Sequence, residues 1–167
     1  MVNKNLKNQI IYFIIFYFVY KYFNKSKFKN IEHKINKISL YSLSSFSYTL
    51  TGLIMLKLKL KNKYYQIFFP YFMIIQGFIS YSADVIYFNK YNIIHDIDKA
   101  FATYNFILCC LIYKLKKEDF IFLLLSIYCF KKGNYYFLNK NYKKYKLYHI
   151  LWHFILPLAG IKKLLET

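Results

Sequence analysis

Two histidines, His149 and His153, lie four residues apart in a segment that otherwise has the composition of an apolar helix. Side chains at this spacing lie on one face of a helix, so both imidazoles can point to the same place. Two imidazoles one helical turn apart can bind one zinc ion if a third ligand comes from another helix. The alternative is a pair of polar rings beside Tyr148 and Trp152 in the interfacial belt of a membrane.

The chain has only seven acidic residues, so their positions are informative. Asp84 and His95 are the two candidates for the third metal ligand. Asp98 can accept a proton from water, and Ser80, four residues before Asp84, can hydrogen-bond a ligand or a developing oxyanion. The predicted site therefore has two catalytic groups, Ser80 and Asp98, and a set of metal ligands: His149, His153, Asp84 and His95.

Simpler explanations exist for several of these residues. Asp84 can pair with Lys90, whose long side chain reaches past apolar neighbours. Asp96 and Asp98 both suit the start of a helix, where a carboxylate caps free amides, and Asp96 is the better candidate for capping. His95 can also be a loop histidine with no role.

Long apolar segments recur along the chain and must position these residues. The sequence is 57% hydrophobic and 23% aromatic, more than an ordinary globular domain of this length. The segments are continuously apolar rather than alternating, which predicts helices and not strands. We predict an all-α fold, a multi-pass transmembrane bundle of about six spans, because about 20 apolar residues cross a bilayer. It forms a single integral membrane domain, residues 1–167, with spans near 9–23, 38–56, 64–88, 94–113, 120–138 and 147–165.

Counting membrane crossings places the candidate residues on one side of the bundle. Asp84 ends the third span, and residues 95–98 begin the fourth. Two crossings later the chain returns to that side, where the sixth span begins with the histidine pair. The start of the second span is also there, with Ser39, Ser42, Ser44 and Ser45. The count depends on one continuous span over 120–138, although Lys131, Lys132 and Gly133 interrupt its apolar pattern.

The charge of +18 suggests an anionic partner, but the sequence does not suit a nucleic-acid reader. It has 25 lysines and no arginine, the residue that reads phosphates and guanine through two parallel hydrogen bonds. The lysines lie in clusters between apolar segments, which is typical of anchors at an anionic headgroup surface. Membrane lipids are thus the expected partners, in an endomembrane. The sequence identifies no protein partner, and its first apolar segment lacks a signal cleavage site, so we expect a retained span.

The motifs S-x-x-x-D, H-x-x-D and Y-H-x-x-W-H follow one another in this order. This set, within Gly77–Ala102 and Tyr148–Gly160, resembles the superfamily of multi-helix membrane hydrolases that includes alkaline ceramidases, adiponectin-type receptors, GPI-remodelling lipases and the fusion protein myomaker. Members carry a Ser and a His one turn apart late in one helix, an Asp early in the next, and an H-x-x-x-H pair in the last. Their three histidines hold zinc, so the resemblance implies a zinc site.

The match covers less than a third of the chain. Ser80 matches the family serine, Asp98 the family aspartate, and the last pair the histidines of the final helix. The position four residues after Ser80 holds Asp84, where most members have a histidine, so either Asp84 is a ligand or His95 has taken over that role. The family core has seven helices, and the resemblance therefore implies a shortened or divergent member.

These observations lead to two main hypotheses for function. The first is a zinc-dependent membrane hydrolase of a lipid amide or ester. The second is a non-catalytic structural or interaction protein of the same membrane fold. A proton-coupled transporter remains a third hypothesis, because Asp and His in membrane helices can form proton relays. Axial ligation of haem is not expected, since residues four apart on one helix lie on the same side.

Overall fold

The computed structural model describes residues 2–23, 35–58, 68–88, 92–112 and 116–165 of the chain. The elements follow in the order α1 (Val2–Phe23), α2 (Leu40–Ser44), α3 (Phe46–Lys57), α5 (Phe69–Tyr81), a π-helical segment (Ser82–Ile86), α6 (Ile93–Ile112), α7 (Lys117–Leu138) and α8 (Tyr142–Leu165). No strand occurs in these described ranges, so the predicted all-α class is confirmed.

The helices differ in several places from the predicted spans. None of the helices in the described part of the chain has both the length and the apolar composition needed to cross a membrane. The last helix begins at Tyr142, so lysine-rich residues before 147 are already helical. Residues 64–67 and 113 of two predicted spans lie outside the described residues.

The segment predicted as one span over 38–56 forms two helices that meet at Ser45. The first, α2, begins where the Ser39 hydroxyl accepts a hydrogen bond from the amide of Ser42 at 3.2 Å, an N-cap typical of serine. By contrast, α7 is uninterrupted at its Lys-Lys-Gly sequence. Gly133 is buried there against α8, and a Cβ added to it would lie 3.8 Å from the Cβ of Tyr148.

The helices α3 and α5 approach each other closely because glycines lie where they cross. A Cβ added to Gly52 would lie 2.5 Å from the carbonyl oxygen of Pro70, and one added to Gly77 would lie 2.0 Å from Oγ1 of Thr49. Such contacts are far shorter than side chains tolerate, so only glycine permits this separation. The glycines thus bring α5, the helix that carries Ser80, close to α3.

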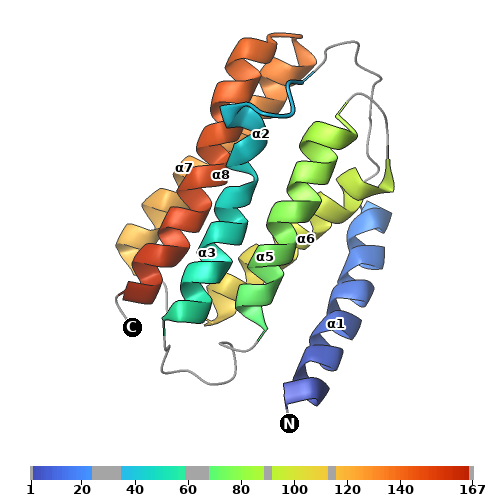
Figure 1. Cartoon of the computed structure of the whole chain (residues 1–167), viewed down its shortest axis with the longest axis vertical. Coiled ribbons are helices and arrows are strands. Elements are labelled where there is room, and N and C mark those ends of the chain that lie inside the picture. The colour runs from blue at the N-terminus through green and yellow to red at the C-terminus, as the bar shows by residue number, and fades with distance from the viewer. Residues whose placement is uncertain (1, 24–34, 59–67, 89–91, 113–115, 166–167) are drawn as a thin grey trace.

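The arrangement places α3 between two other layers (Figure 1). On one side α3 packs against α8, which runs antiparallel beside α7 after a turn at residues 139–141. On the other side it packs against α5, followed by α6 and then α1. A small buried cluster joins α2, the π-helical segment and α8 at one end of the bundle, and it consists of Tyr41, Val85, Phe88 and Tyr145. This is the end of the bundle at which the candidate site lies.

Candidate metal centre

A cavity of about 550 Å³ lies between the helices near that end. Its wall draws on α1, α3, α5, the π-helical segment, α6, α7 and α8, so residues distant in sequence share one space. The predicted site residues all line this cavity, although they come from three different parts of the chain: Ser80, Asp84, His95, Asp98, His149 and His153.

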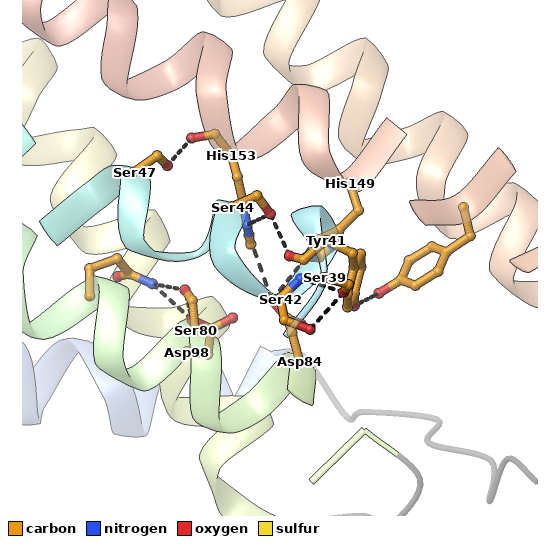
Figure 2. A network of polar contacts seen from close by, with 12 residues as sticks. Ser39, Tyr41, Ser42, Ser44, Ser47, Ser80, Asp84, Asp98, His149 and His153 are labelled. Carbon is orange, nitrogen blue, oxygen red and sulfur yellow. Dashed lines mark hydrogen bonds and ion pairs between the residues drawn. The ribbon is translucent and has the colours of Figure 1, made fainter. Parts of the chain in front are cut away.

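Three of these residues bring potential metal ligands together. The ligand atoms of Asp84, His149 and His153 all lie within 4.8 Å of one another (Figure 2). Asp84 Oδ2 is 2.9 Å from His149 Nε2 and 3.6 Å from His153 Nε2. Ligands about 2.1 Å from a tetrahedral zinc ion are about 3.4 Å apart, so these separations suit a single ion. The group could hold a metal ion, and two imidazoles with one carboxylate are a donor set that zinc accepts.

The π-helical segment directs Asp84 toward α8. Its wider turn is marked by the bond from the amide of Tyr87 to the carbonyl of Ser82, five residues earlier, at 2.9 Å. An unbroken α-helix would put Ser80 and Asp84 on one face, as their spacing suggests. Instead Ser80 faces α6 and Asp84 faces the histidines of α8 (Figure 2). Because of the π-helical turn, Ser80 contacts α6 whereas Asp84 contacts α8.

His153 is held by two serines, one at the end of α2 and one near the start of α3. Its Nδ1 is 3.1 Å from the Ser44 hydroxyl, and its main-chain carbonyl oxygen accepts a hydrogen bond from the Ser47 hydroxyl (Figure 2). His153 is 2% exposed and Ser44 is fully buried, so the contact between the ring and the Ser44 hydroxyl is shielded from solvent. The position of this imidazole is consequently fixed by α2 and α3 as well as by its own helix.

His149 lies against two tyrosines. Its ring centroid is 5.1 Å from that of Tyr41 and 5.2 Å from that of Tyr145. The two buried hydroxyls of these tyrosines hydrogen-bond each other at 3.0 Å, which satisfies both in an apolar cluster. The pair forms a rigid aromatic wall that orients the His149 ring toward Asp84.

A second polar group, built around Asp98, also lines the cavity. Asp98 Oδ1 accepts hydrogen bonds from Ser80 Oγ at 2.5 Å and from Gln76 Nε2 at 2.8 Å. Gln76 also donates to Ser80 Oγ at 2.9 Å, and its own carbonyl oxygen faces Nδ2 of Asn105 at 3.4 Å. Both bonds to Asp98 end on Oδ1, and neither of them uses Oδ2.

Neither His95 nor Asp96 belongs to the group of three ligands. His95 Nε2 is 2.9 Å from the carbonyl oxygen of Tyr87, which only accepts, so this nitrogen carries a hydrogen. His95 is not part of the ligand group found among the described residues. Asp96 is buried but does not line the cavity. Lys90, the suggested partner of Asp84, lies outside the described residues.

Sequence reasoning missed Gln76 and the roles of Ser44 and Ser47. Gln76 had a usable signal, because it lies four residues before Ser80 and therefore on the same helical face. Pro157 was a usable signal for the role of Ser47. It lies four residues after His153 and cannot donate to the carbonyl of that residue, so an outside donor such as a serine was to be expected.

Comparisons with protein-family models, with curated proteins and with solved structures found no match to this chain.

Proposed function

We propose that this protein is a zinc-dependent hydrolase of a lipid amide or ester, and a shortened, divergent member of the ceramidase-like superfamily. The observation that carries the proposal is the ligand group Asp84, His149 and His153, which shares one cavity with the hydrogen-bonded pair Ser80 and Asp98. In this assignment Asp84, and not His95, is the third ligand.

The roles of the residues follow from their contacts. Asp84, His149 and His153 would hold the ion, and the ion would supply a Lewis acid that polarises a carbonyl and makes water a nucleophile near neutral pH. Asp98 Oδ2 accepts a proton from the attacking water. Hydrolysis breaks the C–N or C–O bond, the hydroxyl stays with the acyl carbon, and Asp98 returns its proton to the departing amine or alcohol. Gln76 and Ser80 hold the carboxylate at the angle that this transfer needs.

A lipid substrate is supported by the rest of the cavity wall. Much of the remaining wall is apolar and includes Phe106, Leu123 and Leu156. A cavity that combines clustered polar groups with a large apolar wall suits a substrate with one reactive polar bond and a long hydrocarbon chain. The exact lipid is left open by these contacts, since amides and esters present the same carbonyl.

The proposal includes a location in a membrane. Large apolar side chains are exposed on most of the long helices, for example Phe18, Leu50, Phe78, Leu124 and Leu158. An exterior of this kind supports contact with lipid, because water-soluble monomers keep contiguous apolar surface small. Extraction of cell membranes with alkaline carbonate tests this point: the chain should stay in the membrane pellet and enter solution only with detergent.

Metal content tests the proposed chemistry. The full chain, purified in detergent, should contain stoichiometric zinc by mass spectrometry, and Asp84→Asn or His149→Ala should remove it. His95→Ala is the matched control, because His95 lines the same cavity but lies outside the ligand group. Zinc that is absent from the wild type, or unchanged in the Asp84 and His149 variants, would reject the hydrolase. The alternative would then be the non-catalytic protein of the same fold.

A further inference from the structure

The two ring nitrogens of His153 face in different directions. Nδ1 is 3.1 Å from the hydroxyl of Ser44, whereas Nε2 is 3.6 Å from Oδ2 of Asp84. Figure 2 shows the ring between α2 and the π-helical segment, with the serine and the carboxylate on opposite sides. Both His153 and Ser44 are buried, so the contact between Nδ1 and the Ser44 hydroxyl is shielded from bulk solvent.

The hydrogen bonds of Ser44 decide which nitrogen carries the proton. A serine hydroxyl has one hydrogen to donate, and Ser44 Oγ lies 2.7 Å from the main-chain carbonyl oxygen of Tyr41. A carbonyl oxygen can only accept, so the Ser44 hydrogen is directed to Tyr41. Ser44 Oγ is therefore an acceptor toward His153, and Nδ1 of the imidazole must be the donor. The neutral ring then has no hydrogen on Nε2, and the Nε2 lone pair points toward Asp84.

We infer that Ser44 is a positioning residue for the metal centre: it holds His153 in the tautomer whose Nε2 is free to bind a metal. The inference rests on the proposed function, since a free Nε2 matters only where a metal binds. Ligating histidines are generally oriented by a hydrogen bond from their second nitrogen, and a buried hydroxyl serves that purpose here. Tyr41 takes part through its main chain alone, so its side chain remains available to pack against His149.

Loss of the Ser44 hydroxyl should favour the other tautomer of His153, which carries its hydrogen on Nε2. With no acceptor beside Nδ1, the proton is better placed on Nε2, where Asp84 Oδ2 accepts it. A proton at that position occupies the lone pair that would bind the ion, and it must leave before a metal enters. Ser44→Ala is thus expected to weaken zinc binding by about 10-fold to 100-fold, the usual effect of removing such a partner.

Ser45 provides a matched control. It is the next residue, its side chain is also fully buried, and its hydroxyl has no hydrogen-bond partner in the described part of the chain. Ser45→Ala removes the same atoms from the same segment without changing any bond of His153. It should leave both the tautomer and the zinc affinity as in the wild type.

The test uses the full chain in detergent, with ¹⁵N-labelled histidine and the zinc removed. Nitrogen NMR distinguishes the tautomers directly, and a His153→Gln variant identifies the signals of this ring. We expect hydrogen on Nδ1 in the wild type and in Ser45→Ala, and hydrogen on Nε2 in Ser44→Ala. Chelator competition then measures zinc affinity in the same proteins. Ser44→Thr, which keeps the hydroxyl, should restore both the tautomer and the affinity.

Two results would overturn the inference. The first is a wild-type His153 with its hydrogen on Nε2, a result that does not depend on the folding of any Ser44 variant. The second is a Ser44→Ala protein that binds zinc as tightly as Ser45→Ala does. Failure of the wild type to bind zinc would reject the proposed function instead, while the spectra of the metal-free chain still decide whether Ser44 sets the tautomer.

Discussion

The hydroxyl of Ser47 donates a hydrogen bond to the main-chain carbonyl oxygen of His153. In an uninterrupted helix this oxygen would accept from the amide of residue 157, but that residue is Pro157, which has no N–H. The helix α3 therefore supplies the bond that α8 lacks. His153 is joined to the α2–α3 segment twice, once through its main chain and once through its ring.

This relationship predicts that the effects of Ser47 and Pro157 on stability depend on each other. Ser47→Ala leaves a carbonyl unpaired in the wild type and should lower the free energy of unfolding by about 1–3 kcal/mol. In a Pro157→Ala background the new amide can reach that carbonyl, and Ser47→Ala should then cost much less. A double-mutant cycle, with unfolding followed by circular dichroism in detergent, measures the difference. Equal costs in both backgrounds would show that Pro157 does not create the need for Ser47.

The crossing of α3 and α5 gives a second prediction. Gly77→Ala would put a methyl group 2.0 Å from Thr49 Oγ1 and 3.0 Å from the Thr49 amide nitrogen, and the second atom belongs to the main chain and cannot rotate away. The helices must separate, so we expect a loss of about 1–3 kcal/mol in unfolding free energy and a lower melting temperature. Because Gly77 lies one turn before Ser80, zinc content should be measured on the same sample.

Gly160 is the control for that substitution. It too lies within a helix, but a Cβ added to it would meet nothing within 4 Å. Gly160→Ala should be neutral or should stabilise the helix by up to about 1 kcal/mol, because alanine favours helices over glycine. A similar loss in both variants would mean that close packing at Gly77 is not the cause.

The position of the site along the bundle could be predicted from the sequence, and the reason is simple. A residue's depth depends on where it lies in its helix and on the number of helices between two motifs. That count was sufficient to predict that Asp84 and the last histidine pair occur at one end, which is also the end at which the serine-rich segment containing Ser44 begins. It required α7 to be one helix, which the structure confirms.

The direction of each side chain could not be predicted in the same way. Rotation about a helix axis decides which neighbour a residue faces, and the π-helical turn changes that rotation between Ser80 and Asp84. The sequence therefore left Asp84 and His95 as equal candidates, whereas the structure puts only the first beside His149. The break at Ser45 was missed because the serines around it are uncharged, and no glycine or proline there marks the end of a helix.

The buried amide of Gln76 should affect turnover but not metal binding. Gln76→Met has a similar shape but removes the donor to Asp98 and to Ser80. Asp98 then has one fewer hydrogen bond to fix its carboxylate, and we expect turnover of a lipid amide or ester to fall about 10-fold, at unchanged zinc content. Gln9→Met is the control, because Gln9 accepts from Tyr104 at 2.8 Å and does not line the cavity. Loss of zinc in the Gln76 variant would contradict the separate roles assigned to the metal ligands and to the group around Asp98.

The final prediction concerns Asp98 itself, which is assigned the proton transfer. Asp98→Asn keeps the size of the side chain but cannot take a proton, so turnover should fall by about 10² to 10⁴. Zinc should remain, because Asp98 is not one of the three ligands.

Ser80→Ala should have a smaller effect, since Gln76 still donates to the carboxylate. Asp96→Asn, a buried carboxylate two residues away that does not line the cavity, should retain wild-type turnover. Full activity of Asp98→Asn with zinc bound would show that another group accepts the proton, and the carboxylate would then serve only to orient Ser80.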